Sequence, residues 1–120
     1  MQTKNTPNTE NIIDLKDFQI KGSQVFTGRD RGEKVKNESK FMNLINQSET
    51  VTVIIPDDVY SLNPSFLEEF ISDAVIHLGS EKKFLEKVQF QSSDKYFDII
   101  AELSSAIGRV LRENNALSKK

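Results

Sequence analysis

Asn63-Pro64-Ser65 stands where a long helix is expected to begin, and it places a hydroxyl at a position suited to phosphate chemistry. Asn is a favoured N-cap and Pro fits the first helical position, so Ser65 is expected as the second helical residue. The positive end of the helix dipole would favour a phosphate there by about 0.3–1 kcal/mol. A structural role is equally concrete, because Ser65-x-x-Glu68 has the spacing of a capping box. These residues leave Ser65 as either a phosphoacceptor or a helix cap.

Two apolar side chains precede this serine. Tyr60 and Leu62 are expected to be exposed on the loop before the helix, so together with Asn63 they are candidates for contact with a protein partner. The alternative is that Leu62 packs on Leu67 as a hydrophobic staple.

A turn rich in Gly and Arg is the second candidate site. Gly28, Arg29, Arg31 and Gly32 precede or open a predicted helix, where backbone N–H groups and two guanidiniums could hold a phosphate or a nucleotide. It is not a P-loop, because no Ser or Thr follows Lys34. In the alternative interpretation Gly28 permits a tight turn and both arginines are solvated. Arginine at a helix start opposes the dipole, which favours some further role.

Catalytic groups are few. There is no Cys, and the one His, His77, is expected at the surface near a helix end. Asp57 and Asp58 follow a strand, where α/β sheets often place ligands, but no His or Cys accompanies them. No Gly-x-Ser-x-Gly elbow surrounds a serine. The sequence therefore predicts a protein that is not an enzyme, with no metal site and no cofactor.

Chain length and net charge argue against further classes of protein. The chain has 120 residues, the size of one domain, and sixteen Lys and Arg against eighteen Asp and Glu give a net charge of −2. That balance argues against a dedicated nucleic-acid binder. No apolar run approaches the roughly 18 residues of a membrane span, and no signal-peptide core is present, so we expect a cytoplasmic protein.

Hydrophobic patterning predicts strands that alternate with helices, and hence an α/β fold: a mixed sheet of about four strands with three main helices packed on it. The run VTVII is typical of a strand covered on both faces. The expected strands are 12–20, 25–26, 51–55 and 88–91, and the expected helices are 29–47, 66–78 and one that starts at Ser93 or Asp94. Residues 1–10 are predicted to be a disordered tail, 11–115 the domain, and 116–120 a frayed end.

Two motifs carry a resemblance to a known family. Phe26-Thr27-Gly28-Arg29-Asp30-Arg31-Gly32-Glu33 is similar to a Gly-Arg-x-x-Gly helix opening, and Leu62-Asn63-Pro64-Ser65-Phe66-Leu67-Glu68-Glu69-Phe70 to a helix start after a central strand. In this order around VTVII they resemble the STAS-like family of small bacterial proteins of unknown function, which is related to the STAS domain of anti-sigma-factor antagonists.

The resemblance implies a regulatory role. In the antagonists an Asp-Ser-Ser-Gly segment follows the central strand, and a serine there is phosphorylated by a partner kinase. On that pattern Asn63 replaces the Asp, Pro64 the first Ser and Phe66 the Gly, while Ser65 keeps the second hydroxyl.

The prediction is therefore a non-enzymatic interaction module, a monomer or weak homodimer, that resembles a phosphoserine switch. Its expected partner is an anti-sigma factor or an ATP-binding serine-kinase-like protein, which binds the dephosphorylated form and releases the phosphorylated one. The alternative is an anion- or nucleotide-binding module that uses the turn between Gly28 and Gly32.

Overall fold

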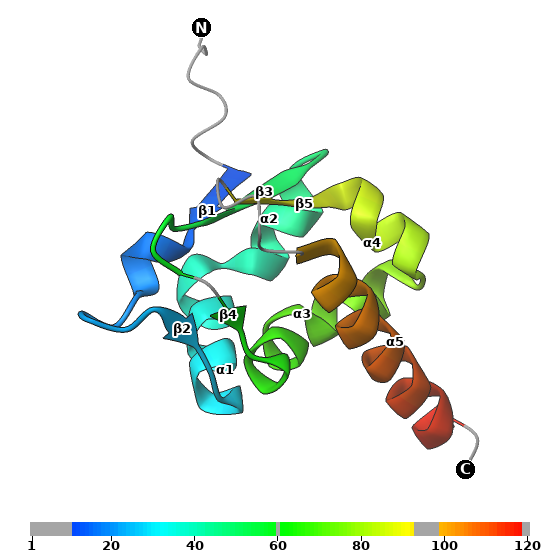
Figure 1. The fold of residues 1–120 in the computed structure, drawn as a ribbon. Coiled ribbons are helices and arrows are strands. Elements are labelled where there is room, and N and C mark those ends of the chain that lie inside the picture. Colours follow the sequence, from blue (N-terminus) through cyan, green and yellow to red (C-terminus); the bar gives the residue numbers. More distant parts are fainter. Residues whose placement is uncertain (1–10, 60, 93–98, 119–120) are drawn as a thin grey trace, which may run out of the picture.

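The computed structural model describes residues 11–59, 61–92 and 99–118, so the N-terminal tail predicted for residues 1–10 lies outside them. The described residues form an α/β fold with five α-helices, five short strands and one 3₁₀ turn (Figure 1). The elements run in the order β1 (Ile12–Asp14), a 3₁₀ turn (Leu15–Phe18), β2 (Val25–Phe26), α1 (Arg29–Ser39), α2 (Phe41–Gln47), β3 (Val51–Ile55), β4 (Ser61–Leu62), α3 (Pro64–Leu78), α4 (Glu81–Lys87), β5 (Val88–Ser92) and α5 (Ile99–Ser118).

Among the described residues all strand pairs are parallel. One sheet has the order β1-β3-β5 and the other pairs β2 with β4. The predicted mixed sheet of about four strands is therefore wrong in both respects. The physical reason is that helices separate consecutive strands of the larger sheet, and a helical crossover returns the chain in the same direction.

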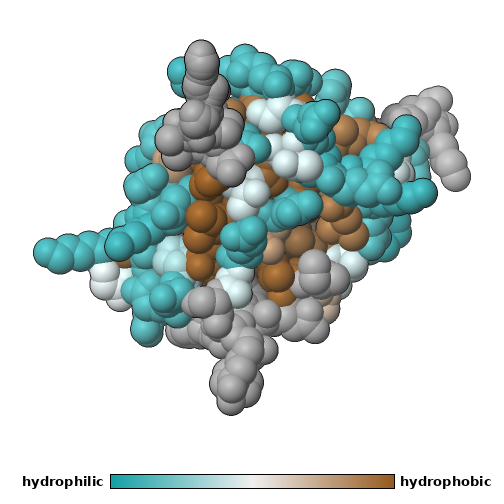
Figure 2. Space-filling model, turned by 90° about the horizontal axis from the view of Figure 1, so that it is seen from above, coloured by the Kyte–Doolittle hydropathy of each residue, from teal (hydrophilic) through white to brown (hydrophobic). Residues whose placement is uncertain are grey.

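The larger sheet has its helices on one face. In Figure 1, α1, α2, α3 and α5 lie below it. Along β3, Val51, Val53 and Ile55 are buried, whereas Thr52 and Ile54 are partly exposed. The sequence predicted that this strand is covered on both faces, whereas the described elements cover only one of them. Figure 2 looks onto the opposite face and shows hydrophobic atoms among hydrophilic ones.

Three sequence predictions differ locally from the structure. The expected strand 12–20 is a three-residue strand followed by the 3₁₀ turn, in which Asp14 accepts a hydrogen bond from the backbone N–H of Lys16 at 3.0 Å. The expected helix 29–47 is divided by Lys40, which has φ 59° and ψ 41°. Neither β4 nor α4 was predicted: Leu62 was assigned to the loop before the Ser65 helix, and the seven residues of α4 are too few to display a helical period.

The other predicted elements agree more closely. β2 and β3 have their predicted bounds, and α3 ends at Gly79, the expected C-terminal glycine, whose φ is 92°. α5 continues through Ser118, three residues into the segment expected to fray. The predicted start of this helix at Ser93 or Asp94 lies outside the described residues. In the described part of the chain no helix is long and apolar enough to span a membrane.

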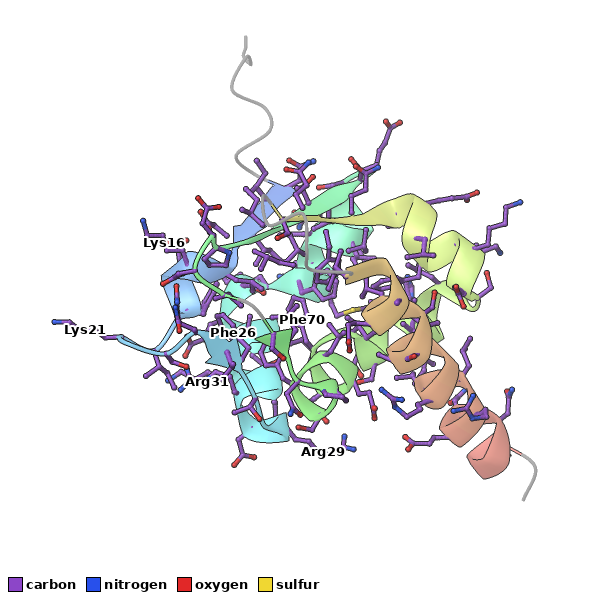
Figure 3. All side chains as sticks on the ribbon, viewed as in Figure 1. Lys16, Lys21, Phe26, Arg29, Arg31 and Phe70 are labelled. Atoms are coloured by element: carbon purple, nitrogen blue, oxygen red, sulfur yellow. The ribbon has the colours of Figure 1, made fainter. Side chains whose placement is uncertain are left out.

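A chain of phenylalanines joins the layers. Phe66 and Phe70 on α3 lie 5.9 Å apart between ring centroids, with Phe26 of β2 5.1 Å from Phe66. Phe70 also stacks on Phe41 of α2 at 4.7 Å and meets the edge of Phe90 of β5 at 6.4 Å (Figure 3 labels Phe26 and Phe70). Aromatic pairs of this kind add about 0.5–1.5 kcal/mol each beyond their buried area. They fix α3 as the central helix.

The crossing of α1 over α3 is tight enough to need a glycine. A Cβ atom on Gly32 would lie 2.5 Å from the carbonyl oxygen of Phe66 and 2.9 Å from Cβ of Glu69. The first of these atoms is backbone, so the clash cannot be relieved by rotating a side chain. Gly32 is thus required for packing.

We expect Gly32→Ala to destabilise the protein by about 1–3 kcal/mol, because the overlap outweighs the better helix propensity of alanine. Gly108→Ala is the matched control. There a Cβ would meet only the flexible end of Arg112 at 3.3 Å, so this variant should be neutral or more stable by up to about 1 kcal/mol. Urea unfolding of the three proteins measures both changes, and equal effects of the two substitutions would contradict the packing argument.

Candidate functional site

The start of α3 has the arrangement expected for an Asn-Pro-Ser helix opening. Asn63 is the N-cap, and its Oδ1 accepts hydrogen bonds from the backbone N–H of Ser65 at 3.0 Å and from the Ser65 hydroxyl at 2.8 Å. Pro64 occupies the first helical position and is exposed. Ser65 is therefore the second residue of the helix, as predicted, and its half-buried hydroxyl is tied to the cap.

The capping box is not formed. Ser65 is not the N-cap, and Glu68 does not reach back to the helix start. Instead the Glu68 side chain, only 9% exposed, forms an ion pair with Nε of Arg109 on α5 and lies 3.6 Å from Nη2 of Arg29 on α1. The capping role that the spacing suggested for Ser65 is therefore filled by Asn63. Glu68 instead connects α3 to α1 and α5 through its ion pairs.

The residues predicted to contact a partner differ in their exposure. Leu62 was expected to be exposed, but it is 1% exposed, so it cannot form part of a docking surface without unfolding. Leu62 directly precedes the N-cap, and Leu67 is the fourth helical residue. These are the two positions of a hydrophobic staple, and both side chains are buried. Asn63 stays partly exposed. Tyr60 lies outside the described residues.

The Gly-Arg turn does not form one site. Gly28, at φ 94°, precedes α1, and its carbonyl accepts the N–H of Gly32 at 3.1 Å. Arg29 and Arg31 are two residues apart on the helix and point in roughly opposite directions (Figure 3). Arg29 lies beside α3 and α5, while Arg31 lines a separate hollow with Asp17 and other residues near the 3₁₀ turn. The four residues proposed to hold an anion are therefore not convergent.

Arg29 has a different environment from the one predicted. Its Nη2 and Nη1 atoms lie 3.6 Å from Glu68 Oε1 and 3.6 Å from Glu69 Oε1, respectively, and its side chain is 58% exposed. Glu69 also lies 3.8 Å from Nζ of Lys36, which is closer to Asp73 at 2.9 Å. The charge at the start of α1 is thus offset by carboxylates of the neighbouring helix.

A groove runs beside this ion-pair cluster, between α3 and α5, with a volume of about 190 Å³. Its lining residues come from three helices: Arg29, Glu68, Glu69, Ser72, Ile76, Val110, Glu113 and Asn114. Ile76 is 45% exposed, and Ile20 is the other large aliphatic residue with comparable exposure in the described part of the chain. The α3 residues of the groove recur at spacings of three and four and continue one turn back to Ser65, so all share one helix face.

Sequence reasoning missed one lining residue of this groove, Ile76, and the partner of a second, Arg109, which pairs with Glu68. Ile76 does not belong to the apolar stripe of its helix, and an apolar residue off the stripe is a signal of exposure that could have found it. Arg109 offered no signal, since its pairing with Glu68 joins positions 41 residues apart.

The other sequence candidates, Asp57, Asp58 and His77, do not line one common pocket. Asp57 and Asp58 are exposed and line a pocket of about 380 Å³ with Asp14, Lys16 and Gln19, at the carboxyl ends of β1 and β3. Asp58 accepts hydrogen bonds from the Gln19 amide at 3.2 Å. His77 is exposed in the last turn of α3, as predicted. Within residues 11–59, 61–92 and 99–118 no three His, Asp or Glu side chains are grouped to hold a metal ion.

Comparisons with protein-family models, with curated proteins and with solved structures find no significant match to this chain. The geometry of α1, α3 and α5 therefore carries the functional argument.

We expect Glu68→Gln to lower the free energy of unfolding by about 1–3 kcal/mol, because it removes the buried charge that two guanidiniums share. Glu69→Gln is the matched control. The Glu69 side chain is 28% exposed and its ion pairs are longer, so its loss should cost less than about 1 kcal/mol. Chemical unfolding at low and high salt measures both, and a Glu69 effect as large as that of Glu68 would contradict the assigned role.

Proposed function

We propose that this protein is a non-catalytic, STAS-like protein-interaction module whose partner binding is switched by phosphorylation of Ser65. The observation that carries the proposal is the position of the Ser65 hydroxyl: it is half-buried, it is at the second residue of α3, and it shares a helix face with the groove that Ile76 lines.

Ser65 suits a regulated modification on chemical grounds. Its side chain is partly exposed beside the exposed Pro64, and among the described residues its hydroxyl donates to the Asn63 side chain, two positions away. Phosphorylation would remove the O–H donor and place about two negative charges at the positive end of a 15-residue helix. The start of α3 would change while the core beneath it remained packed.

The groove between α3 and α5 is the proposed contact surface. It offers an apolar side chain, Ile76, together with charged groups of both signs from Arg29 and Glu113. A partner would cover Ile76 and complement the Arg29 guanidinium with a carboxylate. Asn63, the partly exposed N-cap of the same helix, stays a candidate contact.

The proposed direction of the switch follows from charge. A phosphate on Ser65 would stand one helical turn from Glu68 and Glu69, and the added charge would repel an acidic partner group near Arg29. The unphosphorylated protein would therefore bind and the phosphorylated protein would release its partner. An anti-sigma factor or an ATP-binding serine-kinase-like protein fits this scheme.

Capture of proteins from cell extract by wild type, Ser65→Ala and Ser65→Glu tests the proposal. We expect one partner to be held by wild type and Ser65→Ala and to be lost, by at least about tenfold, with Ser65→Glu, which corresponds to about 1.4 kcal/mol. Ser105→Glu, which places the same charge at an exposed serine of α5, is the control and should retain the partner. Circular dichroism checks that every bait is folded. Identical capture by all four folded baits would overturn the switch.

A further inference from the structure

The position of Arg29 beside Ser65 follows from the helix crossing. Because Gly32 lies against the carbonyl of Phe66, the first turn of α1 sits over the first turn of α3. Arg29 is three residues before Gly32, so its side chain leaves α1 on the face toward α3. Its two nitrogens reach Glu68 and Glu69, the residues three and four positions after Ser65.

Residues three or four apart on a helix have Cβ atoms about 5–6 Å from each other. A guanidinium already 3.6 Å from the carboxylates of Glu68 and Glu69 therefore lies within about one helical turn of a phosphate on Ser65. The long arginine side chain can cover that distance, and because it is 58% exposed little packed structure stands in the way of its rotation.

Arg29 can leave Glu68 and Glu69 without depriving either carboxylate of its remaining ion pair. Glu68 would keep its ion pair with Arg109, and Glu69 would keep the contact of 3.8 Å with Lys36. Both distances from Arg29 exceed those of charge-assisted hydrogen bonds, which are about 2.7–2.9 Å, so little is lost when they open.

The other cations near α1 are less suited to this role. Lys36 is nearly buried, with a side chain 11% exposed, and is held at 2.9 Å by Asp73. Arg31 lies in the hollow near the 3₁₀ turn, on the opposite side of α1.

From this geometry we propose that Arg29 is the phosphate-binding residue of the switch: when Ser65 is phosphorylated, its guanidinium moves from Glu68 and Glu69 to the phosphate. The inference rests on the proposed function for its biological meaning. Guanidinium matches phosphate oxygens as a two-pronged donor, and it pairs with a dianion more strongly than with either distant carboxylate. The groove would lose its only lining cation among the described residues, so the partner's acidic group would lose its counterion.

The test uses full-length protein carrying phosphoserine at position 65 by genetic encoding, with Arg29→Gln and Arg31→Gln variants. A pH titration followed by phosphorus NMR measures the second pKa of the phosphate. We expect that pKa to be lower with Arg29 present than in Arg29→Gln by about half a pH unit or more, because a nearby cation favours the dianion. Arg31→Gln should match the wild type. Equal pKa values with and without Arg29 would overturn the inference.

A second readout covers the case in which the phosphorylated protein does not fold. A double-mutant cycle on thermal unfolding compares Ser65→Glu and Arg29→Gln singly and together. We expect a favourable coupling between the two positions and none between Ser65→Glu and Arg31→Gln. Absence of coupling with Arg29 would count against the inference.

The two proposals fail in different ways. The phosphorus titration needs neither kinase nor partner. If Arg29 lowers the phosphate pKa while phosphorylated and unmodified baits capture the same proteins, the interaction switch is wrong and the phosphate contact stands. If phosphorylation releases the partner but the phosphate pKa is the same with and without Arg29, the interaction switch is supported and the proposed role of Arg29 is wrong.

Discussion

The close crossing of α1 over α3 is the constraint on which the site depends. Because Gly32 lets the two backbones approach, Arg29 is brought beside Glu68 and Glu69, and the start of α1 lies near Ser65. A side chain at this glycine would push the helices apart and separate the two motifs that stand some thirty residues apart in the chain. Packing and candidate function are therefore linked through one missing Cβ.

Glu68 extends that arrangement to α5. Burying a carboxylate almost completely costs free energy unless the charge is paired. Here two guanidiniums from different helices, those of Arg29 and Arg109, pair with it. The pairing sets the spacing of α3 and α5 and so shapes the groove beside Ile76. The same shared carboxylate makes Arg29 dispensable at its present position, since Arg109 alone can satisfy Glu68.

Local patterns predicted the fold where they were long or strongly marked. VTVII and the helix that Asn63 caps and Gly79 ends were identified because β-branched runs, caps and a 3.6-residue period are encoded by neighbouring residues. The division at Lys40, the seven-residue α4 and the parallel direction of the strands were not identified. Tertiary packing decides the first two features, since it buries Phe41 and Phe84 at the cost of an unfavourable backbone angle or a short helix. The parallel direction follows from the helical crossovers between strands of the larger sheet.

The sequence by itself determined that the chain has no Cys and one His, and it predicted a capped helix start with Ser65 at its second position or at the cap, because both follow from residue types and near neighbours. Only the tertiary structure decided that Leu62 is buried, that Arg29 and Arg31 diverge, and that Glu68 pairs with Arg109. Such contacts join residues far apart in the chain. They depend on how helices cross, and a single sequence does not encode that crossing in any local pattern.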